Sequence, residues 1–220
     1  MQGTLLTRSF FEHQPEIVAP RLLGKILVRK VEARSAMAGR IVEVEAYLGP
    51  HNNPPDPAAH SHRGPTPRNS VLFGHAGHAY VYSIYGQYFC LNVSCEVKGS
   101  AGCVLIRALE PIAGLEQMAA NRGFSLMAEP ARRHLGHLTS GPSRLCQALA
   151  ITRVIHNGLD VTESASPLQI VDDGFLVTEA LVTPRIGIKH AVEWPLRFTL
   201  PENPFVSGPK NLPGTLVQIP

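Results

Sequence analysis

The sequence predicts a single domain in which β-strands and short helices share one core. Its 220 residues suit one domain or two small ones, and a hydrophobic content of 44% supplies ample core for one. Segments with the two-residue alternation of strands recur along the chain, and a hairpin signal joins two of them. We find no internal repeat, low-complexity tract or linker, so we expect one domain over residues 1–220.

Charge and cysteine content narrow the class of protein. The formal net charge is +3 and the isoelectric point about 8.8, a mild excess that permits nucleic-acid binding. The four cysteines show neither a C-x-x-C pair nor a disulfide framework, which indicates reduced thiols in an intracellular protein. No secretory leader and no apolar run of about 18 residues stand out, so we expect no membrane contact.

The segment 39–50 is the strongest strand signal, and it ends at a Gly-Pro break. Alternation assigns it two faces: the core face holds Val42, Val44 and Ala46, and the other holds Ile41, Glu43, Glu45 and Tyr47. The second face ends in a carboxylate beside an aromatic ring, a pair that suits a general base acting on a flat substrate. An exposed glutamate on an edge strand explains the same pattern, and this segment alone leaves both readings open.

Other strands are expected at residues 23–30, 79–84, 88–94, 102–109, 184–188 and 195–200. The second and third of these predict a hairpin, with Gly86 supplying the turn and Tyr85 placing a large ring at the tip. The strand at 102–109 is nearly continuous in apolar residues and is therefore central, with Arg107 as the exception. The last twenty residues are rich in proline and are expected to lie extended on the surface.

Helices are expected in residues 5–23, 111–122 and 140–150, with a turn at 33–38 and irregular chain at 124–138. Pro111 and Pro142 fit the first turn of a helix, and Gly123 fits the end of one. Residues 49–70 form a long loop between strong strand patterns. A loop of this length is usually functional or disordered, and we expect an ordered functional loop rather than a linker.

Three pairs of side chains share strand faces by parity: Glu45 with Tyr47, Tyr80 with Tyr82, and Leu105 with Arg107. A carboxylate, several aromatic rings and a guanidinium on these faces would form one pocket that stacks a flat base and holds a water. Ordinary strand tyrosines with an arginine in an ion pair at the core edge also explain the spacing, and spacing alone favours this explanation.

Two further patterns have competing explanations. The pairs His60/His62, His75/His78 and His134/His137 have the spacing of metal ligands, but none lies in an H-E-x-x-H motif or beside a cysteine pair, so hydrogen-bonded loop histidines are favoured. The segment 140–144 combines a helix start, serine hydroxyls and an arginine, which suits an anion. A plain helix N-terminus with proline in its first turn explains that segment as well.

Seven segments, taken in order, resemble the alkyladenine (3-methyladenine) DNA glycosylase family. They are RIVEVEAYLGP (40–50), AAHS (58–61), TPRN (66–69), YVYSIYG running on to YFCLN (80–92), RALEP (107–111), SGPSRLCQAL (140–149) and PRIG (184–187). The likeness covers about residues 9–200. It implies an α+β fold: a single mixed domain around a curved, mostly antiparallel sheet, with a protruding hairpin that inserts into DNA.

The resemblance also implies roles for individual residues. Glu45 matches the general base that activates the attacking water, and Arg107 and the main-chain carbonyl of Ile186 match the groups that hold this water. The implied base pocket consists of Tyr47, His60, Tyr82, Asn92 and Leu105. Its rings stack on the flipped base, and Asn92 disfavours guanine by crowding its exocyclic amine.

The implied DNA contacts are Tyr85, Gln87, Arg68, Ser140, Gly141 and Arg144. Tyr85 matches the residue that fills the gap left in the duplex, where an aromatic ring replaces lost stacking. Gln87 stands where the family pattern has a large apolar residue, and Arg144 replaces a lysine. The loop at 51–57 is longer than the family pattern.

The implied activity is hydrolysis of the N-glycosidic bond of alkylated or deaminated purines after base flipping, leaving an abasic site. The substrates implied are 3-methyladenine, 7-methylguanine, hypoxanthine and ethenoadenine. No lysine lies near Glu45 in the sequence, which favours water as the nucleophile and a monofunctional enzyme. We expect no cofactor or metal, a monomer inside the cell, and double-stranded DNA with a damaged purine as the partner. An inactive duplex-DNA binder of this fold and a His-ligated metallohydrolase remain the alternatives.

Overall fold

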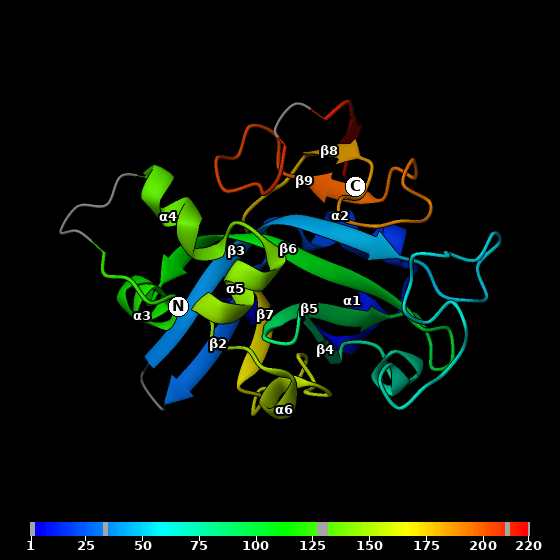
Figure 1. Cartoon of the computed structure of the whole chain (residues 1–220), viewed down its shortest axis with the longest axis horizontal. Helices are drawn as coiled ribbons and strands as arrows, with labels where there is room; N and C mark the ends of the chain where they lie inside the picture. The colour runs from blue at the N-terminus through cyan, green and yellow to red at the C-terminus, as the bar shows by residue number, and fades with distance from the viewer. Residues whose placement is uncertain (1–2, 33–34, 127–131, 210–211, 220) are drawn as a thin grey trace.

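A computed structural model describes residues 3–32, 35–126, 132–209 and 212–219. Its strands are β1 Thr4–Leu5, β2 Ile26–Glu32, β3 Ser35–Tyr47, β4 Ala79–Ile84, β5 Tyr88–Cys95, β6 Gly102–Ala113, β7 Leu168–Asp172, β8 Glu179–Thr183, β9 Arg197–Thr199 and β10 Thr215–Gln218. They form one open sheet in the order β1-β7-β2-β3-β6-β5-β4, with β9 beside part of β3, then β8 and β10. Within the described residues every strand pair is antiparallel. The expected α+β class with a mostly antiparallel sheet is confirmed (Figure 1).

The two long strands β3 and β6 run side by side through the middle of the molecule (Figure 1). Their register shifts between Ile41 and Glu43, an irregularity of the β-bulge kind that breaks the two-residue alternation. Ile41 therefore joins Val42 and Val44 in the main hydrophobic cluster, and the prediction that it shares the face of Glu43 is wrong. Beyond the bulge, Glu43 and Glu45 do lie on a common side, since both contact Arg107.

The predicted hairpin is confirmed as β4 and β5, joined at Tyr85-Gly86-Gln87. Tyr85 and Gly86 both have positive φ, 49° and 76°, and the side chain of Tyr85 is 89% exposed. β5 pairs with β6 only from Asn92 to Cys95, so the hairpin tip diverges from the sheet. Helix α5, Pro142–Ala148, packs against both β5 and β6 and occupies this opening (Figure 1).

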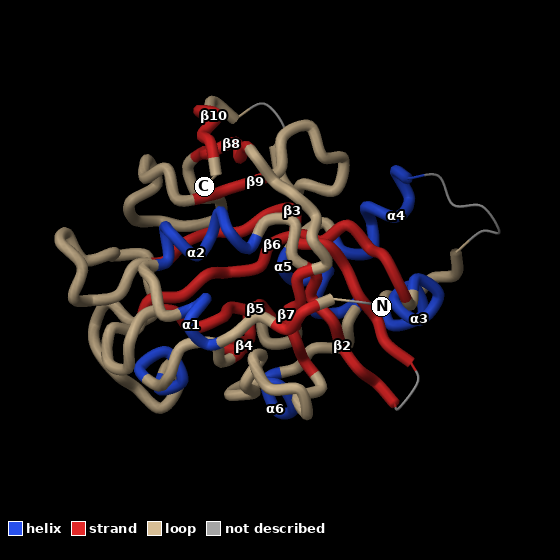
Figure 2. Tube along the Cα trace, turned by 180° about the vertical axis from the view of Figure 1, so that it is seen from behind, coloured by secondary structure: helices blue, strands red, loops and turns tan. Residues whose placement is uncertain are grey.

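The helices are α1 Arg8–Phe11, α2 Pro15–Leu22, α3 Leu115–Asn121, α4 Arg132–Thr139, α5 and α6 Arg153–His156, with a 3-10 turn, η1, at Ser70–Phe73. α1 and α2 confirm the N-terminal helical prediction, and both lie on the side of the sheet turned toward the viewer in Figure 2. α5 begins at Pro142 as expected.

The helix predicted to open at Pro111 is wrong, because Pro111 lies inside β6. The register between β3 and β6 shifts at Ala38/Gly39, opposite this proline, and such irregularities are where a sheet tolerates proline. The helix starts instead at Leu115, after Gly114 with φ 74°. It ends before Gly123, which has φ 77°, as predicted.

The structure also corrects several predicted helix and strand boundaries. Residues 132–138, predicted to be irregular, are helical in α4. Three other parts of the predictions lie outside the described residues: 127–131 of the irregular segment, 33–34 of the turn and 210–211 of the C-terminal stretch. The strand predicted at 184–188 is wrong, because β8 ends at Thr183. β9 lies inside the strand predicted at 195–200. β1, β7, β8 and β10 are additional strands that pair along the outer parts of the sheet.

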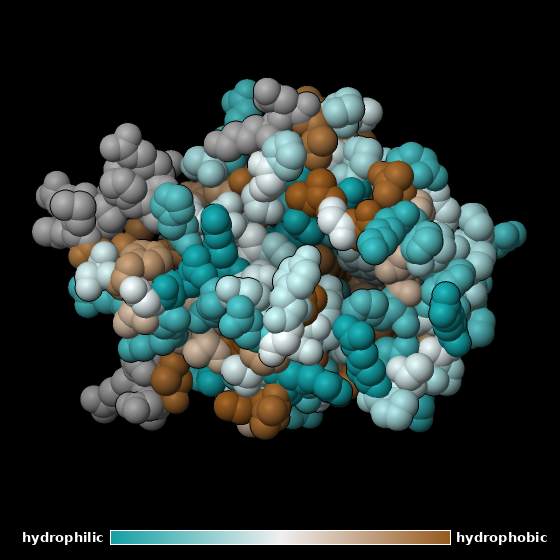
Figure 3. Space-filling view, viewed as in Figure 1, coloured by the Kyte–Doolittle hydropathy of each residue, from teal (hydrophilic) through white to brown (hydrophobic). Residues whose placement is uncertain are grey.

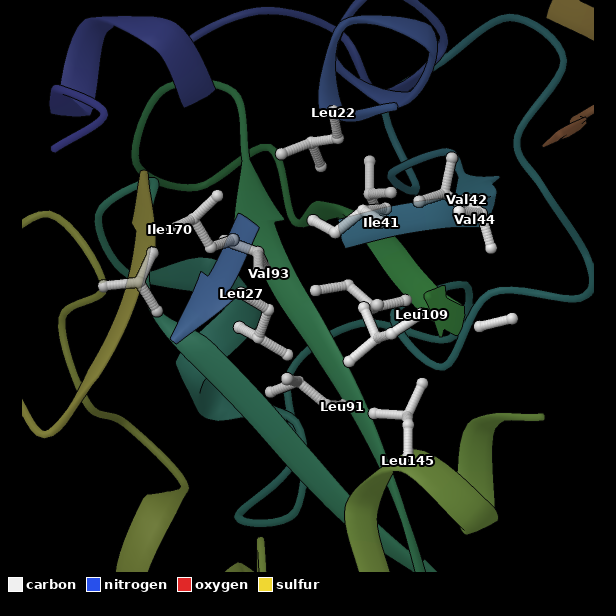
Figure 4. Packing of buried hydrophobic residues seen from close by; sticks show 14 of the residues in the cluster. Leu22, Leu27, Ile41, Val42, Val44, Leu91, Val93, Leu109, Leu145 and Ile170 are labelled. Atoms are coloured by element: carbon white, nitrogen blue, oxygen red, sulfur yellow. The ribbon is translucent and has the colours of Figure 1, made fainter. Parts of the chain in front are cut away.

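One main hydrophobic cluster holds the sheet and helices together. Leu22 of α2, Ile41 and Val42 of β3, Leu91 of β5 and Leu145 of α5 meet in it (Figure 4). Burying a side chain of this size stabilises the fold by about 1.5–3 kcal/mol. The apolar faces of β3 and β6 are therefore held by the core, and Glu45 and Arg107 lie on the other faces of these strands.

The position of Gly114 gives a test of this fold. A Cβ added there would lie 2.9 Å from the carbonyl oxygen of Ala36 and 3.0 Å from Cα of Met37, so both the positive φ and the close approach of β3 require glycine. At Gly123 the φ is similar but nothing lies within 4 Å. We expect Gly123→Ala to lower the free energy of unfolding by about 1–2 kcal/mol and Gly114→Ala by about 2–5 kcal/mol. Urea unfolding measures both, and equal losses would contradict the close approach.

Candidate active site

A cavity of about 370 Å³ opens where β4, β5 and β6 meet the end of β3. Three other segments complete its wall: the loop 49–70, the loop after β8, and the start of α5. Its lining residues are Tyr47, Ala58, His60, Tyr80, Tyr82, Ile84, Tyr85, Cys90, Asn92, Cys103, Leu105, Arg107, Pro142, Ile186, Gly187 and Ile188. The wall thus combines aromatic rings and aliphatic side chains with polar groups, among them tyrosine hydroxyls, an imidazole, an amide and a guanidinium.

The cavity brings together most of the residues singled out in the sequence. All five predicted base-pocket residues line it, and so do Arg107, Ile186 and Tyr85. The parity pairs Tyr80/Tyr82 and Leu105/Arg107 both face it. Among the predicted catalytic residues Glu45 does not line the cavity, because it is fully buried beneath the wall.

Three donors hold the carboxylate of Glu45. Its Oε2 accepts a hydrogen bond from the Tyr47 hydroxyl at 2.9 Å and lies 3.2 Å from Nη1 of Arg107. Its Oε1 accepts the main-chain N–H of Ile186 at 2.9 Å. Burial, and then the negative charge of Glu45, raise the pKa of the Tyr47 phenol, so Tyr47 remains a donor to the carboxylate. The arrangement fixes one carboxylate in a single orientation at the edge of the cavity.

Arg107 links Glu45 to a deeper set of charges. Its Nη1 lies 3.5 Å from the main-chain oxygen of Ile186, and its Nε donates to Glu43 Oε1 at 3.0 Å. Burial opposes the charge of Arg107, but the carboxylates of Glu45 and Glu43 outweigh it and raise its pKa. Glu43 Oε1 also accepts from Nε of Arg197 at 2.7 Å. Arg107 therefore stays cationic beside the cavity.

A separate buried ion pair orders the loops around Tyr47. Arg185 donates to both oxygens of Asp56, at 2.5 and 3.0 Å, and to the main-chain oxygen of Ala46 at 3.1 Å. Its guanidinium carbon lies 4.6 Å from the centre of the Tyr47 ring. Asp56 also accepts the main-chain N–H of Leu48 at 3.2 Å and of Ala58 at 2.9 Å. The pair thus ties the end of β3, the following loop and the loop after β8 to one another.

The loop 49–70 is ordered, as expected, by polar contacts of its own. Asn69 donates to the main-chain oxygens of His60 and Gly64 at 2.8 and 3.1 Å and accepts the N–H of Thr66 at 2.6 Å. Ser61 donates to the oxygen of Ala101 at 2.9 Å. These bonds place His60 at the rim of the cavity despite the long segment that precedes it.

His60 is held by aromatic neighbours. Its Nδ1 lies 3.0 Å from the hydroxyl of Tyr80, and its ring meets that of Tyr82 edge-on with centroids 4.5 Å apart. One side of the imidazole is packed while the other remains accessible. Burial on the packed side, followed by the positive charge of Arg68, lowers the pKa of His60. Burial also raises the pKa of Tyr80 to about 12. Both rings are therefore uncharged at neutral pH.

Asn92 is fixed from two sides at the floor of the cavity. Its Nδ2 donates to the main-chain oxygen of Tyr80 at 3.3 Å, and its Oδ1 accepts from the thiol of Cys103 at 3.8 Å. The amide is nearly fully buried and cannot turn without breaking both contacts. A rigid amide here is able to reject a substituent that a flexible one would accommodate.

The predicted DNA contacts lie outside the cavity, apart from Tyr85. Gln87 is exposed in the hairpin turn, Arg144 is exposed on α5, and Ser140 and Gly141 precede that helix. Arg68 lines a neighbouring cavity that shares His60 and Tyr80 with the first. Figure 3 views this side of the molecule, which is mostly hydrophilic or neutral, with hydrophobic side chains confined to small patches.

The pairs His60/His62 and His75/His78 do not combine into a metal site, and the predicted pair His134/His137 involves a side chain, that of His134, that lies outside the described part of the structure. Among the described residues, no three His, Cys, Asp or Glu side chains gather as metal ligands would. His60 contacts Tyr80, and Nε2 of His78 lies 3.8 Å from Asp160. No helix in the described parts of the chain is long and apolar enough to cross a membrane.

Sequence reasoning missed the residues that support the site from behind. They are Glu43, Asp56, Arg185, Arg197 and Cys103. The contact between Tyr80 and His60 was not predicted either. Glu43 and Asp56 are separated from their arginine partners by 154 and 129 positions. The available signal was the placement of charged residues inside otherwise apolar strands, as in Val42-Glu43-Val44 and Leu196-Arg197-Phe198. A buried charge requires a partner, although its identity is not local.

Comparisons with known proteins identify the family to which this chain belongs. The family model for methylpurine-DNA glycosylase matches residues 9–204. A protein of Koribacter versatilis, provisionally named a 3-methyladenine DNA glycosylase, is 54% identical over 207 residues, covering 94% of this chain and 95% of that protein. Proteins with the same provisional name from Burkholderia cenocepacia and Methanoculleus marisnigri are 45% and 46% identical, covering 94% and 92% of this chain and 92% and 98% of their own. The chain belongs to the methylpurine-DNA glycosylase family.

Proposed function

We propose that this DNA glycosylase, a hydrolase, removes alkylated and deaminated purines that have been flipped out of duplex DNA, leaving an abasic site. Membership in the family makes DNA the substrate. The proposal extends this to 3-methyladenine, 7-methylguanine, hypoxanthine and ethenoadenine. The observation that carries it is a fully buried carboxylate, Glu45, held by three donors at the edge of a cavity walled by aromatic rings.

The reacting groups converge on one place beside the cavity. Nη1 of Arg107 and the main-chain oxygen of Ile186 lie 3.5 Å apart, next to the carboxylate of Glu45. A water here would donate one hydrogen bond to the main-chain oxygen of Ile186 and accept one from Arg107. Its other proton would pass to Glu45 as its oxygen attacks the sugar. The negative carboxylate also stabilises positive charge that develops on the sugar ring.

The cavity walls suit a purine more than a sugar or phosphate. The rings of Tyr47, Tyr82 and His60 offer flat faces and edges, and aromatic faces attract a cationic ring by about 0.5–2 kcal/mol. Purines alkylated at N3 or N7 carry such a charge and leave as neutral bases once the bond breaks. Asn92, held rigid by Tyr80 and Cys103, would exclude the exocyclic amine of guanine.

The exposed hairpin supplies the means to hold the duplex open. Tyr85 projects from a turn with little else around it, so its ring is able to enter the stack in place of the flipped base. Unstacking costs a few kcal/mol, least where a lesion has weakened pairing. Arg68, Arg144, Ser140, Gly141 and Gln87, of which Arg68, Arg144 and Gln87 are exposed, would bind phosphates without regard to sequence.

The role of Glu45 is tested by single-turnover release of hypoxanthine and 7-methylguanine from duplex DNA. We expect Glu45→Gln to bind lesion DNA like the wild type and to release base about 10²- to 10⁴-fold more slowly, because the amide cannot take a proton. Glu12→Gln, at an exposed position, serves as the control with unchanged rate. If the wild type binds the duplex but releases neither base, the chain is an inactive binder of this fold.

The charge state of His60 gives a pH test. Since burial and Arg68 lower its pKa, His60 becomes cationic only in more acidic solution than an ordinary histidine, and an imidazolium would repel a cationic purine. Removing the Arg68 charge raises this pKa toward the ordinary value. We therefore expect the loss of 7-methylguanine release on acidification to begin at higher pH in Arg68→Gln than in the wild type.

The matched control is Arg63→Gln, which removes a positive charge from the same exposed loop. Rates are measured at saturating enzyme, so that weaker DNA binding does not enter. An acid limb that moves equally in both variants, or in neither, would contradict the coupling between Arg68 and His60.

A further inference from the structure

We infer that Glu43 is a positioning residue that orients Arg107 toward Glu45 and the attacking water, with Arg197 as the counter-charge that allows it to do so. The inference rests on the proposed function, because it concerns the same reaction. Glu43 does not line the cavity and is fully buried, so it acts through Arg107 rather than on the substrate.

The orientation of Arg107 depends on contacts along two edges of its guanidinium. Nε donates to Glu43 at 3.0 Å, while Nη1 lies 3.2 Å from Glu45 and 3.5 Å from the oxygen of Ile186. A guanidinium is planar, so fixing Nε on one carboxylate sets where Nη1 points. Without Glu43, only Nη1 of Arg107 would be held, and the guanidinium plane would be free to rotate about that atom.

The fixed point itself is held from several sides. Glu43 Oε1 receives both Arg107 and Arg197, and Glu43 Oε2 accepts the main-chain N–H of Ser207 at 2.6 Å. Arg197 in turn donates to Thr183 Oγ1 at 2.9 Å and to the oxygen of Ser207 at 3.0 Å. Glu43 is thereby anchored to β9 and the segment that follows it, and cannot follow Arg107 if that side chain moves.

Charge balance explains why Arg197 is needed. Glu45, Arg107, Glu43 and Arg197 alternate in sign and are all at least nine-tenths buried. Buried ions are costly unless paired, and the four together carry no net charge. With Arg197 absent, a single arginine would have to compensate two carboxylates and would be drawn between them. With Arg197 present, Glu43 is already neutralised, and the charge of Arg107 remains available to Glu45 and the water.

The network is poorly explained as a stabilising device alone. A buried ion pair contributes little to stability compared with apolar side chains of the same size, whereas removing one partner is strongly destabilising. Two carboxylates on one strand, Glu43 and Glu45, share an arginine that touches the reaction cavity. This geometry is what the fixing of a reacting group requires.

The test compares the wild type with Glu43→Gln and with the double variant Glu43→Gln/Arg197→Met. Because the single variant leaves a buried positive charge uncompensated and is at risk of not folding, the double variant, which removes one charge of each sign, carries the test. The control is Arg40→Met/Asp173→Asn, which removes an ion pair of 2.8 Å that involves the same strand but does not contact Arg107.

Two quantities are measured for each folded variant, with folding checked by thermal unfolding. One is the Kd for duplex DNA containing an uncleavable abasic-site analogue, and the other is the single-turnover rate of hypoxanthine release at saturating enzyme. We expect unchanged Kd and a rate about 100-fold lower in the double variant, since misplacing a reacting group by about 1 Å has an effect of that size. The control should cut like the wild type.

The outcomes separate the two proposals. A folded double variant that cuts within about twofold of the wild type overturns the role of Glu43 and leaves the proposed function standing. A slower rate that only matches a lower folded fraction or weaker Kd overturns it too, because that is a structural effect. If the wild type itself releases no base, the proposed function fails and the inference falls with it.

Discussion

The antiparallel pairing of β3 with β6 is the constraint on which the rest of the site depends. Its register places Glu45 opposite Leu105 and Tyr47 opposite Cys103, so Arg107 emerges between the two carboxylates of β3. The bulge at Ile41/Glu43 keeps Ile41 in the core while Glu43 and Glu45 turn to the same side. A slip of one residue would exchange the two faces and bury apolar side chains where the cavity now lies.

The C-terminal part of the chain supplies further contacts that fix the side chains of β3 and β6 at the cavity. Arg185 reaches back to Asp56 and stacks near Tyr47, Ile186 donates to Glu45, and Arg197 neutralises Glu43. Pairing of β9 with β3, including Glu45 with Arg197, holds this segment against β3. The groups proposed to react are therefore fixed by two buried ionic contacts and a short strand from distant parts of the sequence, not by the sheet core alone.

The sequence predicted what local periodicity controls. Alternation located the hairpin and the shared faces of Tyr80/Tyr82 and Leu105/Arg107, and resemblance identified the residues that the cavity gathers. Prediction from the sequence failed at Pro111, because the preference of proline for the first turn of a helix was outweighed by pairing in an irregular part of β6. It also failed at Ile41, because a bulge in β3 turned this side chain to the core face. It gave no indication of Glu43 with Arg197 or Asp56 with Arg185, because such partners are chosen by the folded topology rather than by neighbours in the chain.

The magnitudes indicate where the selectivity proposed for this site must arise. Attraction between a cationic purine and the aromatic walls amounts to about 0.5–2 kcal/mol, a factor of roughly 2–30 when each 1.4 kcal/mol is tenfold. That is too little to distinguish rare lesions from a large excess of normal bases. The remainder must come from steps that normal bases fail. These steps are leaving the stack, passing the rigid Asn92 and, for the cationic lesions, departing from the sugar without protonation. A site made of uncharged rings and one fixed carboxylate is suited to this kind of selectivity. Its carboxylate stabilises the transition state only at the sugar, so the rate depends on how readily each base leaves.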